Sequence, residues 1–193
     1  MRILVLHAHP NPESYNAALF RRTVEGLKAR GHEVDPCDLH EEDFQPVLTR
    51  AERVGYHAIP SNRAPVEAHV RRLEQAEALV LVYPVWNFGL PAILKGYFDR
   101  VFLPGVSFKL VEGRVQPNLR HIRKLMVVTS YGGPRWRAFL VGDPPRKYAT
   151  RVLRALIKPT ASMRYLAHYD MNRSTDATRA AFMADLDKAL AGF

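Results

Sequence analysis

The residues from Leu79 to Leu103, LVLVYPVWNFGLPAILKGYFDRVFL, constrain the fold more than any other part of the chain. The stretch opens with apolar side chains at every position up to Tyr83, which is typical of a strand buried on both faces of a parallel sheet. The strand ends at Pro84 and is followed by an aromatic turn, WNFG. From Pro91 onward, apolar residues recur with the period of an amphipathic helix. Such a strand–turn–helix predicts an open α/β sheet, which binds ligands at the carboxyl ends of its strands.

Strands and helices are predicted to alternate along the whole chain. The other four strands are expected at Arg2–Leu6, His32–Leu39, Leu125–Thr129 and Ala161–Tyr169, and the helices at about 15–30, 66–76, 91–101 and 145–157, with a last helix capped by Ser174. Pro36 places the second strand at an edge. No repeat or domain boundary interrupts the pattern, so residues 1–193 are expected to form one domain. Its predicted class is α/β, a flavodoxin-like, three-layer, doubly wound, five-stranded parallel sheet of order 2-1-3-4-5, which needs only right-handed crossovers.

Two segments do not follow this alternation. Residues 40–65 contain an acidic stretch, a short predicted helix near 49–56 and a proline-bracketed linker. Residues 103–123 are expected to form a long connection broken by glycines and a proline, and loops of this length are usually functional or interfacial.

Composition excludes several classes of protein. The chain has 193 residues, 47% of them hydrophobic, and no apolar run of transmembrane length, so no membrane insertion is expected. The first residues, MRILVLHAHP, resemble a strand rather than a signal peptide. The lone cysteine, Cys37, cannot form an internal disulfide, which favours a cytoplasmic location, and its place in a strand favours a structural role over a nucleophilic one.

The net charge of +9 is concentrated in one region. Residues 101–160 contain twelve Lys and Arg against only Glu112 and Asp143. Three explanations remain open: a solvated basic face, attraction of a phosphorylated cofactor such as a nicotinamide dinucleotide, and nucleic-acid binding. No zinc-ligand set, helix-turn-helix pattern or aromatic-interleaved basic motif supports the last explanation, so no nucleic-acid partner is expected.

Three loops are predicted to converge at the switch point of the sheet, namely residues 9–16, 84–89 and 129–133. The first loop precedes a helix, whose N-terminal amides and dipole favour an anion, and His9, Ser14 and Asn16 can add donors. Ser14 can also act simply as the helix cap, and the two roles are compatible. The loop matches neither nucleotide-binding glycine motif.

The other two loops favour a flat ligand with polar edges, and a flavin ring is the first candidate. Backbone amides from Val85 to Phe88 can face the edge of a ring, and Trp86 and Phe88 can form its walls, although both aromatics can equally be core residues. The segment from Thr129 to Gly133 supplies hydroxyls and two glycines, or is an ordinary turn. No metal set, hydrolase elbow or acid–base pair is complete, which points to a cofactor that carries the chemistry. The isolated histidines at 32, 57, 69 and 121 are expected at the surface.

The motifs HAHPNPESYNAAL, DFQPVL, YPVWNFGLPAILKGYFDRVF and TSYGG resemble, in order and spacing, the flavodoxin-fold NAD(P)H:quinone oxidoreductases. This group includes DT-diaphorase-like enzymes, modulators of drug activity and ancillary reductases of potassium-efflux systems. The resemblance implies a homodimer that binds FAD or FMN, takes hydride from NAD(P)H, and reduces a quinone or similar small molecule by a ping-pong route. An alternative is a flavin-binding ancillary or regulatory subunit of another protein, such as an ion-efflux system.

The resemblance also implies specific site residues. The phosphate-side loop would comprise His9, Ser14, Tyr15 and Asn16, the isoalloxazine loop Pro84, Val85, Trp86, Asn87 and Phe88, and the second ring-binding loop Thr129, Ser130, Gly132 and Gly133. Two positions depart from the family pattern. Asn87 stands where an aromatic is usual, and no histidine follows the glycines to serve in charge relay. Tyr131, or Arg135 with Trp136, is the candidate for that catalytic role.

Overall fold

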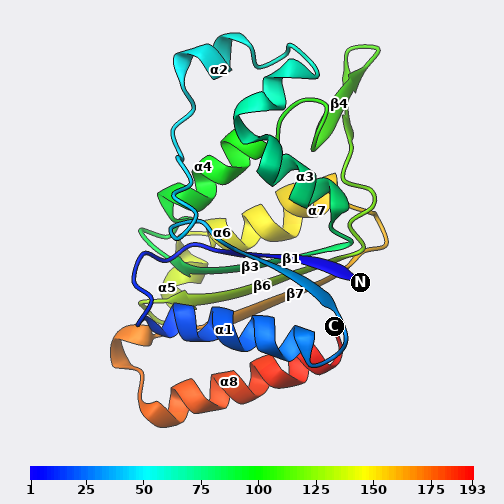
Figure 1. Cartoon of the computed structure of the whole chain (residues 1–193). Coiled ribbons are helices and arrows are strands. Elements are labelled where there is room, and N and C mark those ends of the chain that lie inside the picture. Colours follow the sequence, from blue (N-terminus) through cyan, green and yellow to red (C-terminus); the bar gives the residue numbers. More distant parts are fainter.

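A parallel sheet of five strands lies at the centre of the computed structural model, which describes residues 1–193 (Figure 1). In spatial order the strands are β2 (Glu33–Asp38), β1 (Arg2–His7), β3 (Ala78–Val85), β6 (Lys124–Tyr131) and β7 (Ser162–His168). This is the predicted order, and the strand with Pro36 lies at an edge as predicted. All four neighbouring pairs are parallel, so the carboxyl ends of the strands share one edge of the sheet.

Helices cover both faces of the sheet, which confirms the predicted three-layer, doubly wound class (Figure 1). On one face lie α1 (Tyr15–Lys28) and α8 (Asp176–Ala191); on the other lie α3 (Glu67–Gln75), α4 (Ala92–Val101) and a continuous segment made of α6 (Pro144–Lys147), the π-helical turn η2 (Tyr148–Leu153) and α7 (Arg154–Leu156). Each layer encloses its own hydrophobic cluster against the sheet. None of the helices is both long enough and apolar enough to cross a bilayer.

The central strand β3 is buried along its whole length, as its apolar sequence predicts. The helix that follows it, α4, packs its apolar stripe into the hydrophobic cluster on its own face of the sheet, and Tyr97 and Val101 are fully buried there. The chain's own residues cover this stripe.

The middle parts of the two irregular segments lie beyond α3 and α4, on the side away from the sheet (Figure 1). Residues 40–66 contain α2 (Arg50–Val54), capped by Thr49, and the 3-10 helix η1 (Ser61–Val66). The prediction of an unstructured connection over 103–123 is wrong, because β4 (Phe108–Val111) and β5 (Arg114–Pro117) form an antiparallel hairpin. Its two-residue turn, Glu112-Gly113, has positive φ at both positions, as tight hairpins prefer. The Asn62 side-chain amide donates to the Pro104 carbonyl 3.0 Å away and joins the two segments.

Two further expectations from sequence are corrected near the carboxyl edge. The segment after β6, where no helix was predicted, contains a short helix, α5 (Arg135–Leu140). The cap of α8 is Thr175 rather than Ser174, because the N–H of Thr178 donates to the Thr175 hydroxyl. Both Ser and Thr are good caps, so the sequence located this helix start to within one residue.

Packing between helices and their neighbours predicts unequal effects of two glycine substitutions. A Cβ at Gly96 in α4 would overlap the backbone of Pro46, whereas a Cβ at Gly26 in α1 would meet only the end of the Leu190 side chain, which can rotate away. Both substitutions gain about 1 kcal/mol of helix propensity. We expect Gly96→Ala to destabilise the fold by about 2 kcal/mol and Gly26→Ala to be close to neutral. Urea unfolding of the two variants measures this, and equal midpoints would contradict the packing argument.

Candidate functional site

The three predicted loops meet at the carboxyl edge of the sheet, at the left in Figure 1. They enclose an α1-side cavity of about 260 Å³. Its lining residues are His9, Ser14, Tyr15, Asn16, Pro84, Val85, Trp86, Ser130, Gly132, Met171 and Asn172. An adjoining α5-side cavity of about 210 Å³ is lined by Val85, Asn87, Phe88, Tyr131, Gly132, Gly133, Pro134 and Ala138. The cavities share Val85 and Gly132, so together they form one depression across the strand ends.

The first loop presents polar groups at the start of α1. The Ser14 hydroxyl accepts a hydrogen bond from the Ala17 N–H at 3.1 Å. Ser14 is therefore the helix cap, which is one of the two roles predicted for it. Asn16 is 97% buried, and neither its side-chain oxygen nor its nitrogen has a partner in the protein. A buried amide without partners costs free energy unless a ligand or water completes its hydrogen bonds. Asn16 is therefore the strongest sign that a polar ligand belongs here.

His9 lies across the cavity as a neutral donor. Its Nδ1 accepts a hydrogen bond from the Asn11 N–H at 3.0 Å, which leaves the proton on Nε2. Burial lowers the pKa of His9, and the nearby His7 acts in the same direction. The His9 ring meets Trp86 edge-on at 5.6 Å, so the first and second loops are in direct contact.

Tyr15 lines the α1-side cavity, but its hydroxyl is not free to bind a ligand, because it donates to the Arg179 carbonyl of α8 at 3.0 Å. Burial raises the pKa of Tyr15 to about 12, so the phenol stays protonated. The hydroxyl thus anchors α1 to α8 rather than facing a ligand.

The second loop is a tight turn in a strained conformation. Trp86 and Gly89 exchange two backbone hydrogen bonds, and the two central residues, Asn87 and Phe88, have φ of 49° and 55°. This is the left-handed region, which asparagine tolerates and phenylalanine does not favour. Trp86 and Phe88 are 44% and 41% exposed, so the alternative that both are core residues is wrong. The turn also explains why an asparagine suits position 87, where the resembled family has an aromatic.

Two pairs of substitutions separate strain in this turn from the role of the rings. At position 88, Phe88→Gly and Phe88→Ala both remove the ring, but only glycine relieves the positive φ. We expect the glycine variant to be more stable by about 1 kcal/mol. At Trp86, where the backbone is ordinary, the order should reverse, with Trp86→Ala more stable than Trp86→Gly. Thermal unfolding of the four variants tests this, and the same order at both positions would argue against strain.

In the third loop, Thr129 does not present its hydroxyl to the site. Thr129 is fully buried, and its hydroxyl donates to the Tyr83 carbonyl at 2.6 Å, so its side chain does not reach either cavity. Ser130 and the two glycines line the depression. The register pairs Pro84 with Ser130, which brings the second and third loops side by side.

Tyr131 lines the α5-side cavity with its ring, while its hydroxyl is engaged elsewhere. The hydroxyl donates to Asp143 Oδ1 at 2.6 Å and lies 2.6 Å from the Tyr165 hydroxyl. Burial raises the pKa of Tyr131, and the hydrogen bond to Asp143 adds to this effect. Proton transfer from Tyr131 to a ligand would first require this network to open, and its catalytic role stays a prediction.

Residues after β7 and in α5 complete the site and were missed from the sequence. The N–H of Asn172 donates to the Gly132 carbonyl at 3.1 Å, and a Cβ at Gly132 would lie only 3.3 Å from the Asn172 side chain. Met171 and Asn172 follow the fifth strand, whose carboxyl end is adjacent to that of the fourth in the predicted order. That adjacency was the signal that could have found them.

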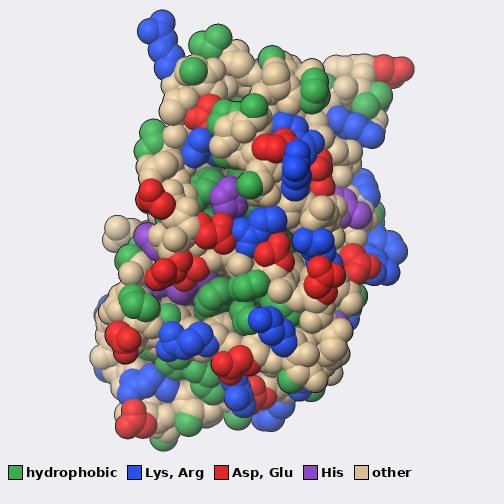
Figure 2. Space-filling view, viewed as in Figure 1, with side chains coloured by type: hydrophobic (Ala, Val, Ile, Leu, Met, Phe, Trp, Pro, Cys, Tyr) green, Lys and Arg blue, Asp and Glu red, His purple; other side chains and the backbone are tan.

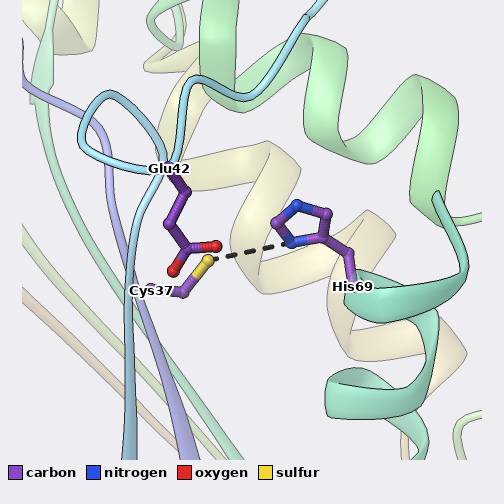
Figure 3. Close-up of side chains that lie close together, drawn as sticks. All are labelled: Cys37, Glu42 and His69. Atoms are coloured by element: carbon purple, nitrogen blue, oxygen red, sulfur yellow. Dashed lines mark hydrogen bonds between the residues drawn. The ribbon is translucent and has the colours of Figure 1, made fainter.

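A separate cluster lies between β2 and α3. The side chains of Cys37, Glu42 and His69 point toward one another, with Cys37 Sγ 3.9 Å from His69 Nδ1 (Figure 3). His69, predicted at the surface, is only partly exposed, because it packs edge-on against Phe44. Both Glu42 carboxylate oxygens accept hydrogen bonds from Arg72 Nη1, at 2.7 and 2.8 Å. These contacts account for the cluster as hydrogen-bonded packing, so it does not require an ion.

Burial makes Cys37 a poor nucleophile. The thiol is fully buried, and this burial raises its pKa. We expect an aromatic disulfide to modify it at least about 100-fold more slowly in the native protein than in urea at pH 8. Because the unfolded thiol loses its proton near pH 8.5 while the folded one keeps it, stability should fall as pH rises above about 8.5. Cys37→Ala should lack this fall, and rapid native modification would contradict the prediction.

Comparison with known proteins agrees with this architecture. A family model described as a flavodoxin-like fold matches residues 1–190. The chain is 30% identical over 147 residues to the Rattus norvegicus protein named NAD(P)H dehydrogenase (quinone) 1, a match that covers 68% of this chain and 54% of the rat protein. The chain thus spans about half the length of that curated relative.

Two solved structures share the fold across nearly their whole length. The NAD(P)H:quinone oxidoreductase from Methanothermobacter marburgensis has a TM-score of 0.80 at 24% identity, over 98% of this chain and 97% of that one. An FMN-dependent NADH-azoreductase from Bacillus anthracis, solved in complex with FMN, has a TM-score of 0.78 at 17% identity, over 98% and 97%. The chain belongs to the flavodoxin-like family. Its predicted resemblance to the NAD(P)H:quinone oxidoreductases of that fold is confirmed.

Proposed function

We propose that the protein is a flavin-dependent NAD(P)H oxidoreductase that reduces quinones or related two-electron acceptors by a ping-pong route. The observation that carries the proposal is the depression at the carboxyl edge, where three loops, a buried unpartnered amide and two exposed aromatics converge. The names of the rat and Methanothermobacter relatives support the same class of reaction.

The residues of the α1-side cavity fit the phosphate end of a flavin. The first turn of α1 has backbone N–H groups without intrahelical acceptors, and its dipole favours negative charge. Asn16 offers an unpartnered amide and His9 an Nε2–H donor. Small neutral donors around an anion are the chemistry that a phosphate ester needs.

The residues of the α5-side cavity fit the ring end. Phe88 offers an exposed aromatic face, and the backbone between Val85 and Phe88 can approach the polar edge of the ring. Gly132 and Gly133, which line the same cavity, allow a ligand to approach the backbone closely. We favour FMN over FAD, because the structural relative from Bacillus anthracis is FMN-dependent.

When bound, the flavin supplies the chemistry by accepting hydride from NAD(P)H and giving two electrons to the acceptor. The protein's residues bind and orient the reactants. Trp86 and Phe88 are exposed at the rim, so they can limit water and hold a flat substrate by stacking. Tyr131 would line the ring end of the site and, if its hydrogen bond to Asp143 opened, could return a proton.

Assembly and location belong to the same proposal. We place the enzyme in the cytoplasm as a homodimer. Exposed apolar side chains at Val47, Val54 and Ile59, on the segment beyond α3 and α4, are consistent with a surface that pairs with a second copy. The connection that contains the β4–β5 hairpin adjoins this segment and also exposes Val115.

Reconstitution with a matched pair of variants tests the proposal. The purified protein should retain FMN or FAD with flavin absorbance and oxidise NADH or NADPH when a quinone is present. Asn16→Asp, which adds a negative charge inside the α1-side cavity, should weaken flavin binding at least about tenfold. Asn11→Asp adds the same charge to the exposed part of the same loop and should have a much smaller effect.

Flavin fluorescence quenching gives the affinities, and stopped-flow absorbance separates flavin reduction from reoxidation. A protein that binds neither flavin and oxidises no NAD(P)H with any quinone would show the proposal to be wrong.

A further inference from the structure

A third cavity opens next to the α5-side cavity. It has a volume of about 580 Å³ and lies between α5 and the α6–η2 segment. Its lining residues are Arg135, Phe139, Gly142, Asp143, Arg146, Lys147, Thr150, Arg151 and Tyr169. We call it the basic cavity, because four of these nine residues are Lys or Arg.

The cations of the basic cavity have no acidic partners. None of Arg135, Arg146, Lys147 and Arg151 forms an ion pair within 4.0 Å. The single carboxylate in the lining, Asp143, already accepts a hydrogen bond from the Tyr131 hydroxyl. Other cations are paired: Arg72, for example, forms ion pairs with two carboxylates, and on the face seen in Figure 2 basic and acidic side chains are interspersed.

Fold stability does not explain this arrangement. Lys147 and Arg151 are four residues apart along one helical segment, where like charges destabilise a helix by a few tenths of a kcal/mol. The segment also widens into a π-helical turn at Tyr148–Leu153, a conformation that recurs at functional sites. Arg146 is held in place over the Tyr165 ring, 5.1 Å from its centroid. Cations gathered without acidic partners, one of them held over an aromatic ring, are suited to bind an anion with several oxygens.

The basic cavity is within reach of the proposed flavin site. Tyr131 lines the α5-side cavity, and its ring stacks at 4.6 Å on Tyr169, which lines the basic cavity. The α5 residues Ala138 and Phe139 line one cavity each. A molecule that lies over the α5-side cavity can therefore extend its charged part into the basic cavity, past the exposed ring of Phe139.

We propose that the basic cavity is an oxyanion subsite, which binds the phosphate groups of the nicotinamide dinucleotide or the sulfonate or carboxylate of an anionic acceptor. The inference rests on the proposed function and adds a substrate class to it. It also assigns a role to part of the excess of Lys and Arg in residues 101–160.

The test compares substrates with and without the anionic group on the flavin-loaded protein. The double variant Arg146→Gln/Arg151→Gln should raise KM at least about tenfold for substrates that bind the subsite and leave kcat little changed. The control double variant, Lys109→Gln/Arg114→Gln, removes two unpaired cations from the hairpin and should leave KM unchanged. Because Arg151 is exposed, Arg151→Gln alone serves if the double variant unfolds.

Two arms identify the source of the anion. NADPH and NADH are compared with reduced nicotinamide riboside, which lacks phosphate, and anthraquinone-2-sulfonate is compared with a neutral quinone. An effect confined to NADPH and NADH assigns the subsite to the dinucleotide, and one confined to the sulfonate assigns it to the acceptor. Equal effects on charged and uncharged substrates, or no effect on any, overturn the proposal.

Direct binding separates this inference from the proposed function. Calorimetry with inorganic pyrophosphate needs no turnover, and we expect Arg146→Gln/Arg151→Gln to weaken binding at least about tenfold relative to the hairpin variant. Retained pyrophosphate binding in a protein without flavin activity would count against the oxidoreductase and leave the anion site standing. Equal affinity in both double variants overturns the site.

Discussion

Burial of β3 between β1 and β6 is the constraint on which the rest of the structure depends. All eight residues of this strand are buried, so its register with both neighbours is determined by apolar packing on two faces at once. A register shift of one residue would turn each β3 side chain toward the opposite face of the sheet, away from its own hydrophobic cluster. The same register sets Val85 opposite Tyr131, and therefore determines where the second and third loops meet.

The sequence predicted the elements in which apolar residues recur with a regular period and are buried in the core. The five strands, their order and the helices around them follow from apolar periodicity, and the three loops follow from the strand ends. Elements that bury little were missed, such as α5, whose Phe139 is 80% exposed and whose apolar residues follow no core-facing period. The β4–β5 hairpin was missed for the same reason, because Leu110 and Val115 face solvent.

Side-chain contacts at the site were beyond what the sequence could show. The motifs selected residues by type, but the hydroxyl of Thr129 turns toward Tyr83, and that of Tyr131 turns toward Asp143. Met171 and Asn172 reach the cavity only because β7 ends beside β6. At position 87 the structure explains a departure from the motif, because Asn87 suits the positive φ of a strained turn.

Because some cations are paired with carboxylates and others are not, the positive charge is distributed unevenly over the molecule. Ion pairs such as Arg72–Asp35 and Arg100–Glu52 cancel locally, whereas the cations beside α5 and α6 keep their charge, so that part of the +9 is displaced toward one end of the sheet. A negatively charged molecule within about one Debye length, about 8 Å at physiological salt, experiences a torque as well as an attraction. Encounters would then begin with the two molecules already turned toward productive contact, which shortens the search and makes it sensitive to ionic strength.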